Sequence, residues 1–237
     1  MRLASFNIKN GVSDDGSCDP DMLVRACRML RADVLALQEV DRGVPRSGNA
    51  DQTALVAGGC GLNGLYAPAR RLDGGEYGNA LLVRGSFADV EHIRLPVAPR
   101  KEARAVVLAG VEVGGVALSV AATHLQNRHG RPPPTPTDAA EQLEQLEVVL
   151  AGLARRRRPR ALLGDLNMPP EVAVPVLEAA GYEVADSKPT VVVGAPKFRI
   201  DYIAVDGLAI GGSEVLDTDV SDHRALVVEV EAAEGRA

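Results

Sequence analysis

The stretch "ALQEVDR", residues 36–42, joins an apolar run to a group of polar side chains. Residues 33–38 are predicted to form a buried β-strand, and Glu39 follows directly at its end. A polar turn after a strand explains one such carboxylate taken alone, and this interpretation is kept for Asp41. Gln38 is expected to support its neighbours. The role of Glu39 therefore depends on what the other strands carry at their ends.

The same pattern, an apolar strand that runs into acid, amide or imidazole groups, recurs along the chain. The residues are Asn7 after the first strand, His124 and Asn127 in "VAATHLQNR", Asp165 and Asn167 in "ALLGDLNMPP", Asp201 in "FRIDYIAV", and Asp222 with His223 in "VSDHRAL". Rigid scaffolds usually carry their functional residues at such positions.

Most of these residues also have a purely structural explanation. His124 can be a capped imidazole at the end of a strand, and Asp165 can form an Asx turn. Asp222 and His223 can lie in an exposed turn. Asp201 is harder to explain in this way, because it interrupts an apolar run and a carboxylate inside a strand needs a partner. Taken together, the residues match one chemistry.

That chemistry is metal-assisted phosphoryl transfer. Mg²⁺ binds a few carboxylate or carbonyl oxygens and keeps several waters, so one or two acids such as Glu39 and Asp222 are sufficient. Asn and His side chains supply the donors that phosphate oxygens need, and a carboxylate can orient the attacking water. Zinc is disfavoured, because Cys18, Cys27 and Cys60 do not cluster and no His-x-x-x-His pair is present.

Seven segments, in this order, resemble the endonuclease/exonuclease/phosphatase superfamily, which includes DNase I-like nucleases, abasic-site endonucleases, sphingomyelinases and inositol polyphosphate phosphatases. The segments are Asn7, Gln38-Glu39, Tyr77-Gly78-Asn79-Ala80, Thr123-His124, Gly164-Asp165-Leu166-Asn167, Asp201-Tyr202 and Ser221-Asp222-His223. The resemblance implies an α+β fold, a four-layer α/β/β/α sandwich of two mixed, mainly antiparallel sheets with the active site at one end. We expect one domain over residues 1–237, with 231–237 as a disordered tail.

The resemblance also implies roles for the acids. Glu39 is expected to be the principal ligand of Mg²⁺ or Mn²⁺, with Asn7 and Asp222 near the ion directly or through water. Asp165 is expected to position or deprotonate the attacking water. His223, oriented by Asp201, is expected to stabilise the transition state or to act as the base, so two candidates for the base stay open.

The implied phosphate contacts are His124, Asn127 and Asn167, of which Asn167 also holds the water. Arg104 is a further candidate, although an ion pair with Glu102 explains it equally well. These residues make the phosphate ester itself the expected partner.

Four other features have two interpretations each. Many abasic-site nucleases carry Asp two residues after the first-strand Asn, whereas this chain has Lys9, which puts a positive charge at the pocket rim or is simply solvated. Asn79 supports the pocket floor or forms a turn. The proline-rich residues 131–136 overhang the site or lead stiffly into a helix. Residues 155–158, all arginine, favour a solvated helix C-terminus over nucleic-acid binding, because cations there are stabilised by the helix dipole.

The remaining elements follow from periodicity and turn signals. Helices are predicted after Asp19-Pro20, near 49–59, after a capping box of Asp138 and Glu141, and over 170–180. Strands are predicted at 2–8, 64–68, 79–84, 88–95, 160–164, 182–185, 190–193, 199–205, 208–216 and 224–231, and as a hairpin of 104–112 and 115–123 about Gly114-Gly115.

The composition of the chain disfavours some classes of function. The 237 residues carry a net charge of -6 and 3% aromatic residues without Trp, which disfavours a basic, base-stacking nucleic-acid surface. The sequence predicts a cytoplasmic protein without a signal peptide or a membrane span and with no obligate protein partner. We expect a metal-dependent phosphoesterase, with a slight preference for a small-molecule, lipid-headgroup or short nucleic-acid substrate. A DNA or RNA nuclease and an inactive scaffold of the same fold are the alternatives.

Overall fold

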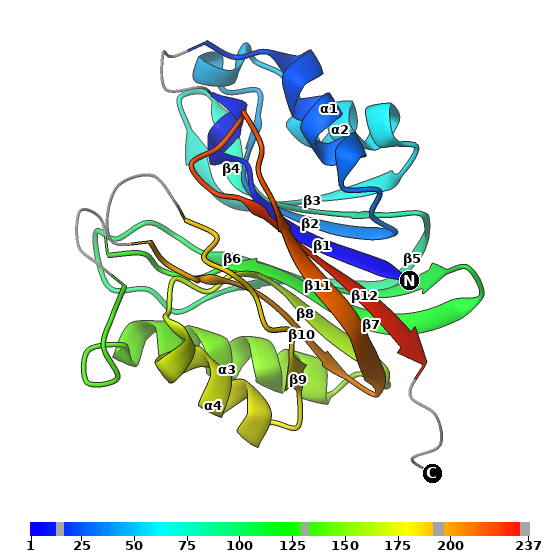
Figure 1. Ribbon diagram of the computed structural model, residues 1–237. Helices are drawn as coiled ribbons and strands as arrows, with labels where there is room; N and C mark the ends of the chain where they lie inside the picture. Colours follow the sequence, from blue (N-terminus) through cyan, green and yellow to red (C-terminus); the bar gives the residue numbers. More distant parts are fainter. Residues whose placement is uncertain (13–16, 129–132, 192–196, 233–237) are drawn as a thin grey trace.

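Two β-sheets of six strands each pack face to face in the computed structural model, which describes residues 1–12, 17–128, 133–191 and 197–232 (Figure 1). The strand order of sheet one is β11 (Leu208–Leu216), β12 (Ala225–Ala232), β1 (Arg2–Asn7), β2 (Val34–Arg42), β4 (Gly75–Val83), β3 (Asn63–Leu72). The order of sheet two is β5 (Gly85–Arg94), β6 (Ala105–Val113), β7 (Val116–His124), β8 (Arg160–Asp165), β10 (Asp201–Asp206), β9 (Glu183–Val184).

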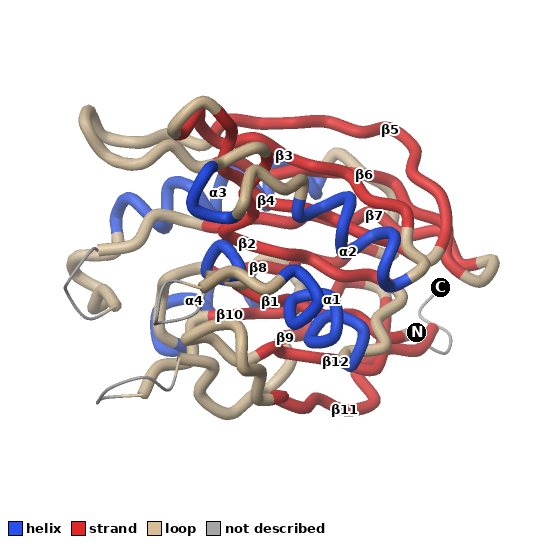
Figure 2. The backbone as a smooth tube through the Cα atoms, turned by 90° about the horizontal axis from the view of Figure 1, so that it is seen from above, coloured by secondary structure: helices blue, strands red, loops and turns tan. Residues whose placement is uncertain are grey.

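Helices cover the outer face of each sheet. The helices α1 (Pro20–Met29) and α2 (Gln52–Cys60) lie on sheet one, and α3 (Ala140–Ala154) and α4 (Pro170–Ala179) lie on sheet two (Figures 1 and 2). Only β1 with β2 and β7 with β8 pair in parallel; the other strand pairs are antiparallel in the described part of the chain. The expected four-layer α/β/β/α sandwich is confirmed.

Three apolar layers hold the four structural layers together. Leu3 and Leu163 belong to the layer between the sheets, Phe6 and Leu35 to the layer under α1 and α2, and Leu162 to the layer under α3 and α4. Central strands therefore have both faces buried, which explains why their sequences are continuous apolar runs rather than alternating ones. No helix in the described ranges is long and apolar enough to cross a membrane.

Several local predictions are confirmed and others are corrected. Asp19 caps α1 by accepting the N–H groups of Asp21 and Met22, and Gly114 and Gly115 close the β6–β7 hairpin with φ of 58° and 81°. The α2 helix begins at Gln52 rather than 49, because Asp51 is the residue that caps it.

The predicted capping box before α3 is wrong. Asp138 instead accepts hydrogen bonds from the backbone N–H and hydroxyl of Thr135, which leaves Ala139 at the cap position without a side-chain bond. Glu141 turns outward to Lys101 and the N–H of Ala98. The Asp138 carboxylate is engaged by Thr135, so a local turn replaces the cap.

The ends of the remaining predictions fall partly outside the described residues. Val191 forms isolated bridges to Phe198 and His223 rather than a strand, and residues 192 and 193 are not described. The proline-rich stretch is described only from residue 133. Residues 231 and 232 belong to β12, which corrects the start of the expected tail; residues 233–237 are not described.

A test of the sheet geometry uses Gly164. A Cβ at this position would overlap the carbonyl oxygen of Thr123 on the neighbouring strand, so Gly164→Ala must push apart β7 and β8. We expect a loss of about 2 kcal/mol or more in the free energy of unfolding, measured by urea denaturation. Gly212→Ala in β11 is the matched control, because a Cβ there meets nothing within 4 Å. Equal stability of the two variants would contradict the packing.

Candidate active site

The polar residues identified at the strand ends meet at one end of the two sheets. Asn7 ends β1, His124 ends β7, and Asp165 ends β8. The antiparallel β10 begins at that end with Asp201, which lies directly opposite Asp165 in the ladder. His124 lies opposite Asp165 on the other side. Strand register thus places a buried carboxylate between an imidazole and a second carboxylate.

Glu39 reaches the site through a β-bulge. The pairing of β2 with β4 shifts between Leu37 and Val40, and Glu39 takes a left-handed φ of 58°. Because β2 continues to Arg42, the prediction of a strand end at residue 38 is wrong. Bulges are frequent beside active sites, where they redirect a side chain, and a strained non-glycine residue at such a place points to function.

Asp41 is likewise not part of a turn. It lies in β2, is fully buried, and accepts two hydrogen bonds of 2.8 Å from Arg46. The turn interpretation is therefore wrong, and the ion pair is what allows this carboxylate to be buried. Gln38 is also buried and shares a hydrogen bond with Ser5 on β1, consistent with support.

Asn7 links the two sheets. Its Oδ1 accepts the backbone N–H of Lys9 at 3.1 Å. Because a backbone N–H can only donate, Nδ2 must face the other way, where it donates to Glu39 Oε1 at 3.2 Å and to Asp165 Oδ2 at 3.1 Å. Asn7 therefore presents an N–H group, not an oxygen, to the carboxylates, which favours an indirect role at a metal over a direct one.

His223 is oriented by Asp201, as predicted from the sequence. The distance from His223 Nδ1 to Asp201 Oδ2 is 2.9 Å, and from His223 Nε2 to Asp165 Oδ2 it is 3.8 Å. Burial lowers the pKa of His223, but the charge and hydrogen bond of Asp201, together with Asp165 and Asp222, outweigh burial and raise this pKa to about 10. In the absence of a metal, the imidazole is therefore charged at neutral pH.

Asp165 is the most perturbed acid of the group. Burial and the neighbouring charge of Asp201 raise its pKa to about 7, against the lowering effects of His223, Asn7 and the N–H of Asn167. The Asx turn suggested by the sequence exists, since Asp165 Oδ1 accepts the N–H of Asn167 at 2.9 Å. The turn and the functional interpretation are thus compatible, and the turn fixes the carboxylate.

Arg104 lies behind His124. Its Nη1 is 3.0 Å from His124 Nδ1, 3.4 Å from Glu102 Oε1 and 3.5 Å from the hydroxyl of Tyr77, and its side chain is 2% exposed. An arginine can only donate, so Nδ1 of His124 accepts and the proton of the neutral ring sits on Nε2. That Nε2 lies 3.5 Å from Asp165 Oδ2. The ion pair with Glu102 is present, and a direct phosphate contact of Arg104 stays a prediction.

Two glutamines of α3 form a support that the sequence analysis missed. Gln145 accepts the N–H of Gln126 at 2.7 Å and donates to Pro96, and Gln142 donates to the carbonyl of Gln126 at 2.8 Å. Both are buried. The sequence signal for this support is a pair of side-chain amides, three residues apart, on the apolar side of the helix.

These bonds hold the loop that carries Asn127. Asn127 Oδ1 is buried and has no hydrogen-bond partner among the described residues. Asn167, with a left-handed φ of 51°, donates from Nδ2 to the carbonyl of Leu125 in the same loop. Contact of either amide with a phosphate stays a prediction.

The structure decides between the two interpretations of Asn79 and of Lys9, and both residues lie next to the site. Asn79 lies within β4, not in a turn, and donates to the carbonyl of Ala105 on β6 at 2.9 Å, which joins the sheets beneath the site. Lys9 Nζ lies 3.6 Å from Asp222 Oδ2, so the interpretation of Lys9 as a simply solvated residue is wrong.

Among the described residues, Asp165, Asp201 and His223 have ligand atoms within 4.8 Å of one another and are able to hold a divalent ion. Asp201 Oδ2 and His223 Nδ1 of this group are 2.9 Å apart and share a hydrogen bond. Glu39 and Asp222, the ligands expected from the sequence, offer hard oxygen ligands of the kind that Mg²⁺ prefers, and their role at a metal stays a prediction.

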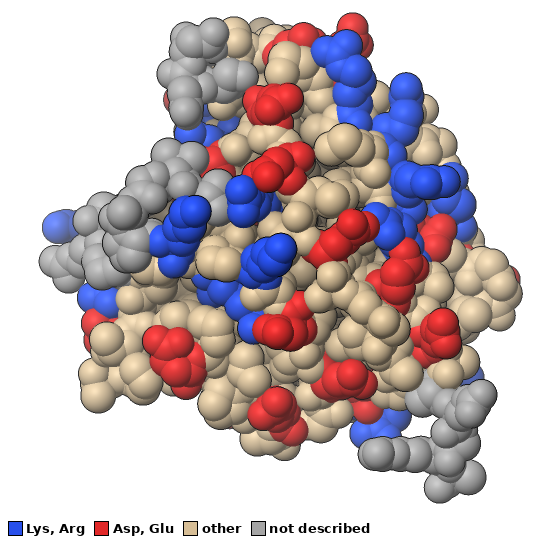
Figure 3. Space-filling view, in the orientation of Figure 1, with Lys and Arg blue, Asp and Glu red and all other residues tan. Residues whose placement is uncertain are grey.

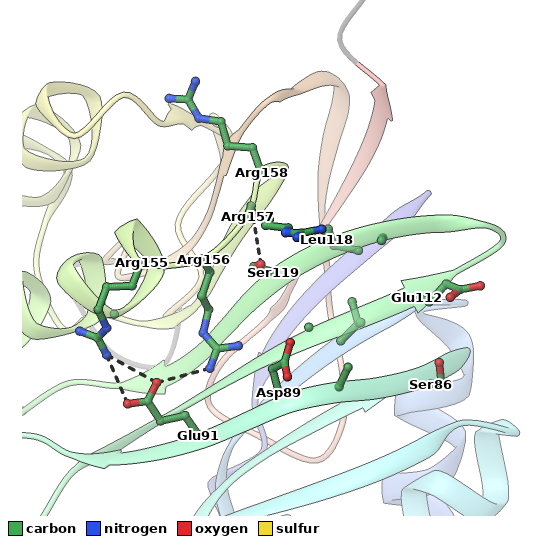
Figure 4. Close-up of a pocket in the computed structure, with 15 residues that line it drawn as sticks. Ser86, Asp89, Glu91, Glu112, Leu118, Ser119, Arg155, Arg156, Arg157 and Arg158 are labelled. Carbon is green, nitrogen blue, oxygen red and sulfur yellow. Dashed lines mark hydrogen bonds and ion pairs between the residues drawn. The ribbon is translucent and has the colours of Figure 1, made fainter.

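A cavity of about 710 Å³ lies elsewhere, between β5, β6, β7 and the C-terminal end of α3 (Figure 4). None of the site residues lines it. Arg155 and Arg156 lie on its wall and pair with Glu91 at 3.2 and 3.4 Å. The expectation of a solvated arginine end is wrong for Arg156, whose side chain is 13% exposed, because Glu91 draws it onto the sheet.

The sequence profile of the Endonuclease/Exonuclease/phosphatase family matches residues 4–223. The chain belongs to this family. Its members are phosphoester hydrolases, and the matched region spans every site residue described above. No curated protein sequence matches the chain.

Solved structures show the same fold at low identity. A family protein from Beutenbergia cavernae DSM 12333 is similar with a TM-score of 0.79 at 23% identity, over 98% of this chain and 71% of that one. A mannosyl-6-phosphatase from Bacteroides thetaiotaomicron VPI-5482 has a TM-score of 0.75 at 15% identity, over 98% and 99%. The catalytic domain of human nocturnin, with bound sulfate, has a TM-score of 0.67 at 18% identity, over 98% and 94%.

The charge of His223 can be tested in metal-free protein. The raised pKa predicts an ion pair with Asp201 whose stabilisation is complete below pH 6.5 and is lost as the pH rises through about 10. Imidazole resonances followed by NMR should show His223 still protonated at pH 8, and Asp201→Asn should move its titration down toward 6.5. His92, whose pKa burial lowers, is the internal control. Titration of His223 near 6.5 in the unmodified protein would be the contrary result.

Proposed function

We propose that this chain is a phosphoesterase that uses Mg²⁺ or Mn²⁺ and hydrolyses a P–O bond by in-line attack of water. The observation that carries the proposal is the position of Asp165. One carboxylate oxygen, Oδ2, lies 3.1 Å from Asn7, 3.5 Å from His124 and 3.8 Å from His223. A buried acid with a pKa near neutrality, surrounded by donors, suits the orientation and deprotonation of a water molecule.

Each residue has a role in this mechanism. Glu39 would hold the ion, assisted by Asp222 directly or through water, and the ion would supply charge stabilisation at a phosphate oxygen. Asp165 orients the water as an ionised carboxylate. Protonated His223 donates to the transferring phosphoryl group and is held by Asp201.

The neutral His124 completes the oxygen contacts. Its Nε2–H faces the same space as Asp165, and Arg104 fixes the tautomer from behind. Asn127 and Asn167 are the further proposed phosphate contacts. Preorganised donors of this kind stabilise developing charge without reorganisation during the reaction.

The surface favours a small or short substrate. Basic and acidic side chains lie side by side on the face shown in Figure 3, without an expanse of one sign. With a net charge of -6, the protein lacks the general attraction that duplex nucleic acids require. We therefore propose a small phosphoester, a lipid headgroup or a short oligonucleotide as substrate, in the cytoplasm.

Hydrolysis assays test the proposal. We expect p-nitrophenyl phosphate or bis-p-nitrophenyl phosphate to be cleaved with Mg²⁺ or Mn²⁺ and not with EDTA, and plasmid DNA to be cleaved more slowly. Asp165→Asn and His223→Ala should each lower kcat/KM on the order of 10²-fold or more, because each removes a proton-transfer or charge-stabilising group. His92→Ala on β5 is the matched control. Activity that survives both site substitutions would refute the assignment.

Metal binding can be measured without turnover. Glu39→Gln should weaken Mn²⁺ binding about 10-fold or more in electron paramagnetic resonance titrations, because it removes a charged ligand. Glu112→Gln on β6 should bind as the unmodified protein does. If Asp201→Asn abolishes binding while Glu39→Gln does not, the ion belongs to Asp165, Asp201 and His223 instead.

A further inference from the structure

Lys9 follows the first strand and has a backbone conformation that residues other than glycine rarely adopt. Both Lys9 and Asn10 are left-handed, with φ of 47° and 61°. This conformation is unfavourable for most non-glycine residues, although least so for Asn, and it persists where surrounding contacts enforce it. The fold therefore fixes the backbone of Lys9, and with it the point from which the side chain extends.

Three hydrogen bonds hold this turn, and an ion pair fixes one of the residues that make them. The N–H of Lys9 is bound by Asn7 Oδ1 at 3.1 Å, and Asn10 Oδ1 accepts from Arg46 Nη2 at 2.6 Å. Gln52 donates to the carbonyl of Asn10, and Arg46 is in turn fixed by the buried Asp41. The same asparagine that donates to Glu39 and Asp165 thus sets the backbone of Lys9.

The ammonium group of Lys9 faces the acidic side of the site. Its Nζ is 3.6 Å from Asp222 Oδ2, and the two side chains are 35% and 33% exposed. Asp222 in turn acts electrostatically on its neighbour His223. An ammonium has three N–H donors, and the side chain of Lys9 is partly exposed, so an oxygen of a bound phosphate can approach it.

The charges distinguish two kinds of phosphate ester. A phosphodiester carries one negative charge, whereas the terminal phosphate of a monoester carries close to two at pH 8. In the proposed mechanism, His223 and a metal held by Glu39 would serve the reacting phosphoryl group of either ester. A further fixed cation at the rim interacts with the additional charge that only the monoester has.

We propose that Lys9 binds the non-bridging oxygens of a terminal phosphate and makes this site prefer phosphomonoesters to phosphodiesters. The inference rests on the proposed function and adds the substrate class to it. The fixed turn supplies the position, Asp222 supplies the orientation of the ammonium, and the partial exposure leaves access for a ligand.

The test compares one monoester and one diester with the same leaving group. For p-nitrophenyl phosphate, Lys9→Met should lower kcat/KM about 10-fold, the effect of one partly exposed charge pair. For bis-p-nitrophenyl phosphate the change should stay within about 3-fold. Lys9→Arg should retain the monoester preference, and Lys188→Ala, which removes an exposed lysine outside the site, should change neither substrate.

Calorimetry provides a second readout that does not depend on turnover. In the presence of Mg²⁺ at pH 8, Lys9→Met should weaken binding of inorganic phosphate about 10-fold and leave binding of the monoanionic dimethyl phosphate unchanged.

The outcomes separate the two proposals. If the unmodified protein hydrolyses both esters but Lys9→Met affects them equally, or affects neither, the inference about Lys9 is overturned and the proposed function stands. If the unmodified protein hydrolyses neither ester with either metal, the proposed function fails and the inference fails with it.

Discussion

The structure of the site depends on the side-chain amide of Asn7. This amide lies at the end of β1 in sheet one and donates to Glu39 of the same sheet and to Asp165 of the other. Apart from the bond of Asn79 to the carbonyl of Ala105 and the Asn7 bonds, the described sheets pack largely through apolar side chains, which set their separation but not their relative position to the accuracy that catalysis requires. A polar bond across the sandwich fixes that position at the end where the carboxylates converge.

Burying several acids together is unfavourable, and the site compensates for it in pairs. Asp41 is paired with Arg46, Asp201 with His223, and Asp222 with Lys9. Asp165 has hydrogen bonds and lies 3.8 Å from His223, but burial and the neighbouring charge of Asp201 outweigh these and raise its pKa. A divalent ion beside Glu39 would add the positive charge that this group of acids lacks, which is why metal binding and catalysis are proposed to be coupled.

Some of the backbone strain lies at the same place. Glu39, Lys9, Asn10 and Asn167 have left-handed φ angles and belong to or adjoin the site, whereas the other residues of this kind, such as Arg31 and Asp89, lie elsewhere. Hydrogen bonds hold two of these conformations, since Asn7 accepts the N–H of Lys9 and Asp165 accepts the N–H of Asn167. The apolar sandwich supplies the stability that allows this strain to persist.

The sequence by itself determined most of the helices and strands, and its resemblance to the family implied the four layers and the group of polar residues at one end. Continuous apolar runs, helical periodicity and a glycine hairpin define elements locally, and a set of polar residues at strand ends identifies the family's site without knowledge of distances. Other features could not be predicted, because they depend on contacts between residues far apart in the chain. The bulge that turns Glu39 into the site arises from the register of β2 against β4. The position of Arg104 behind His124 and the buried glutamines of α3 depend in the same way on which strand and loop each faces.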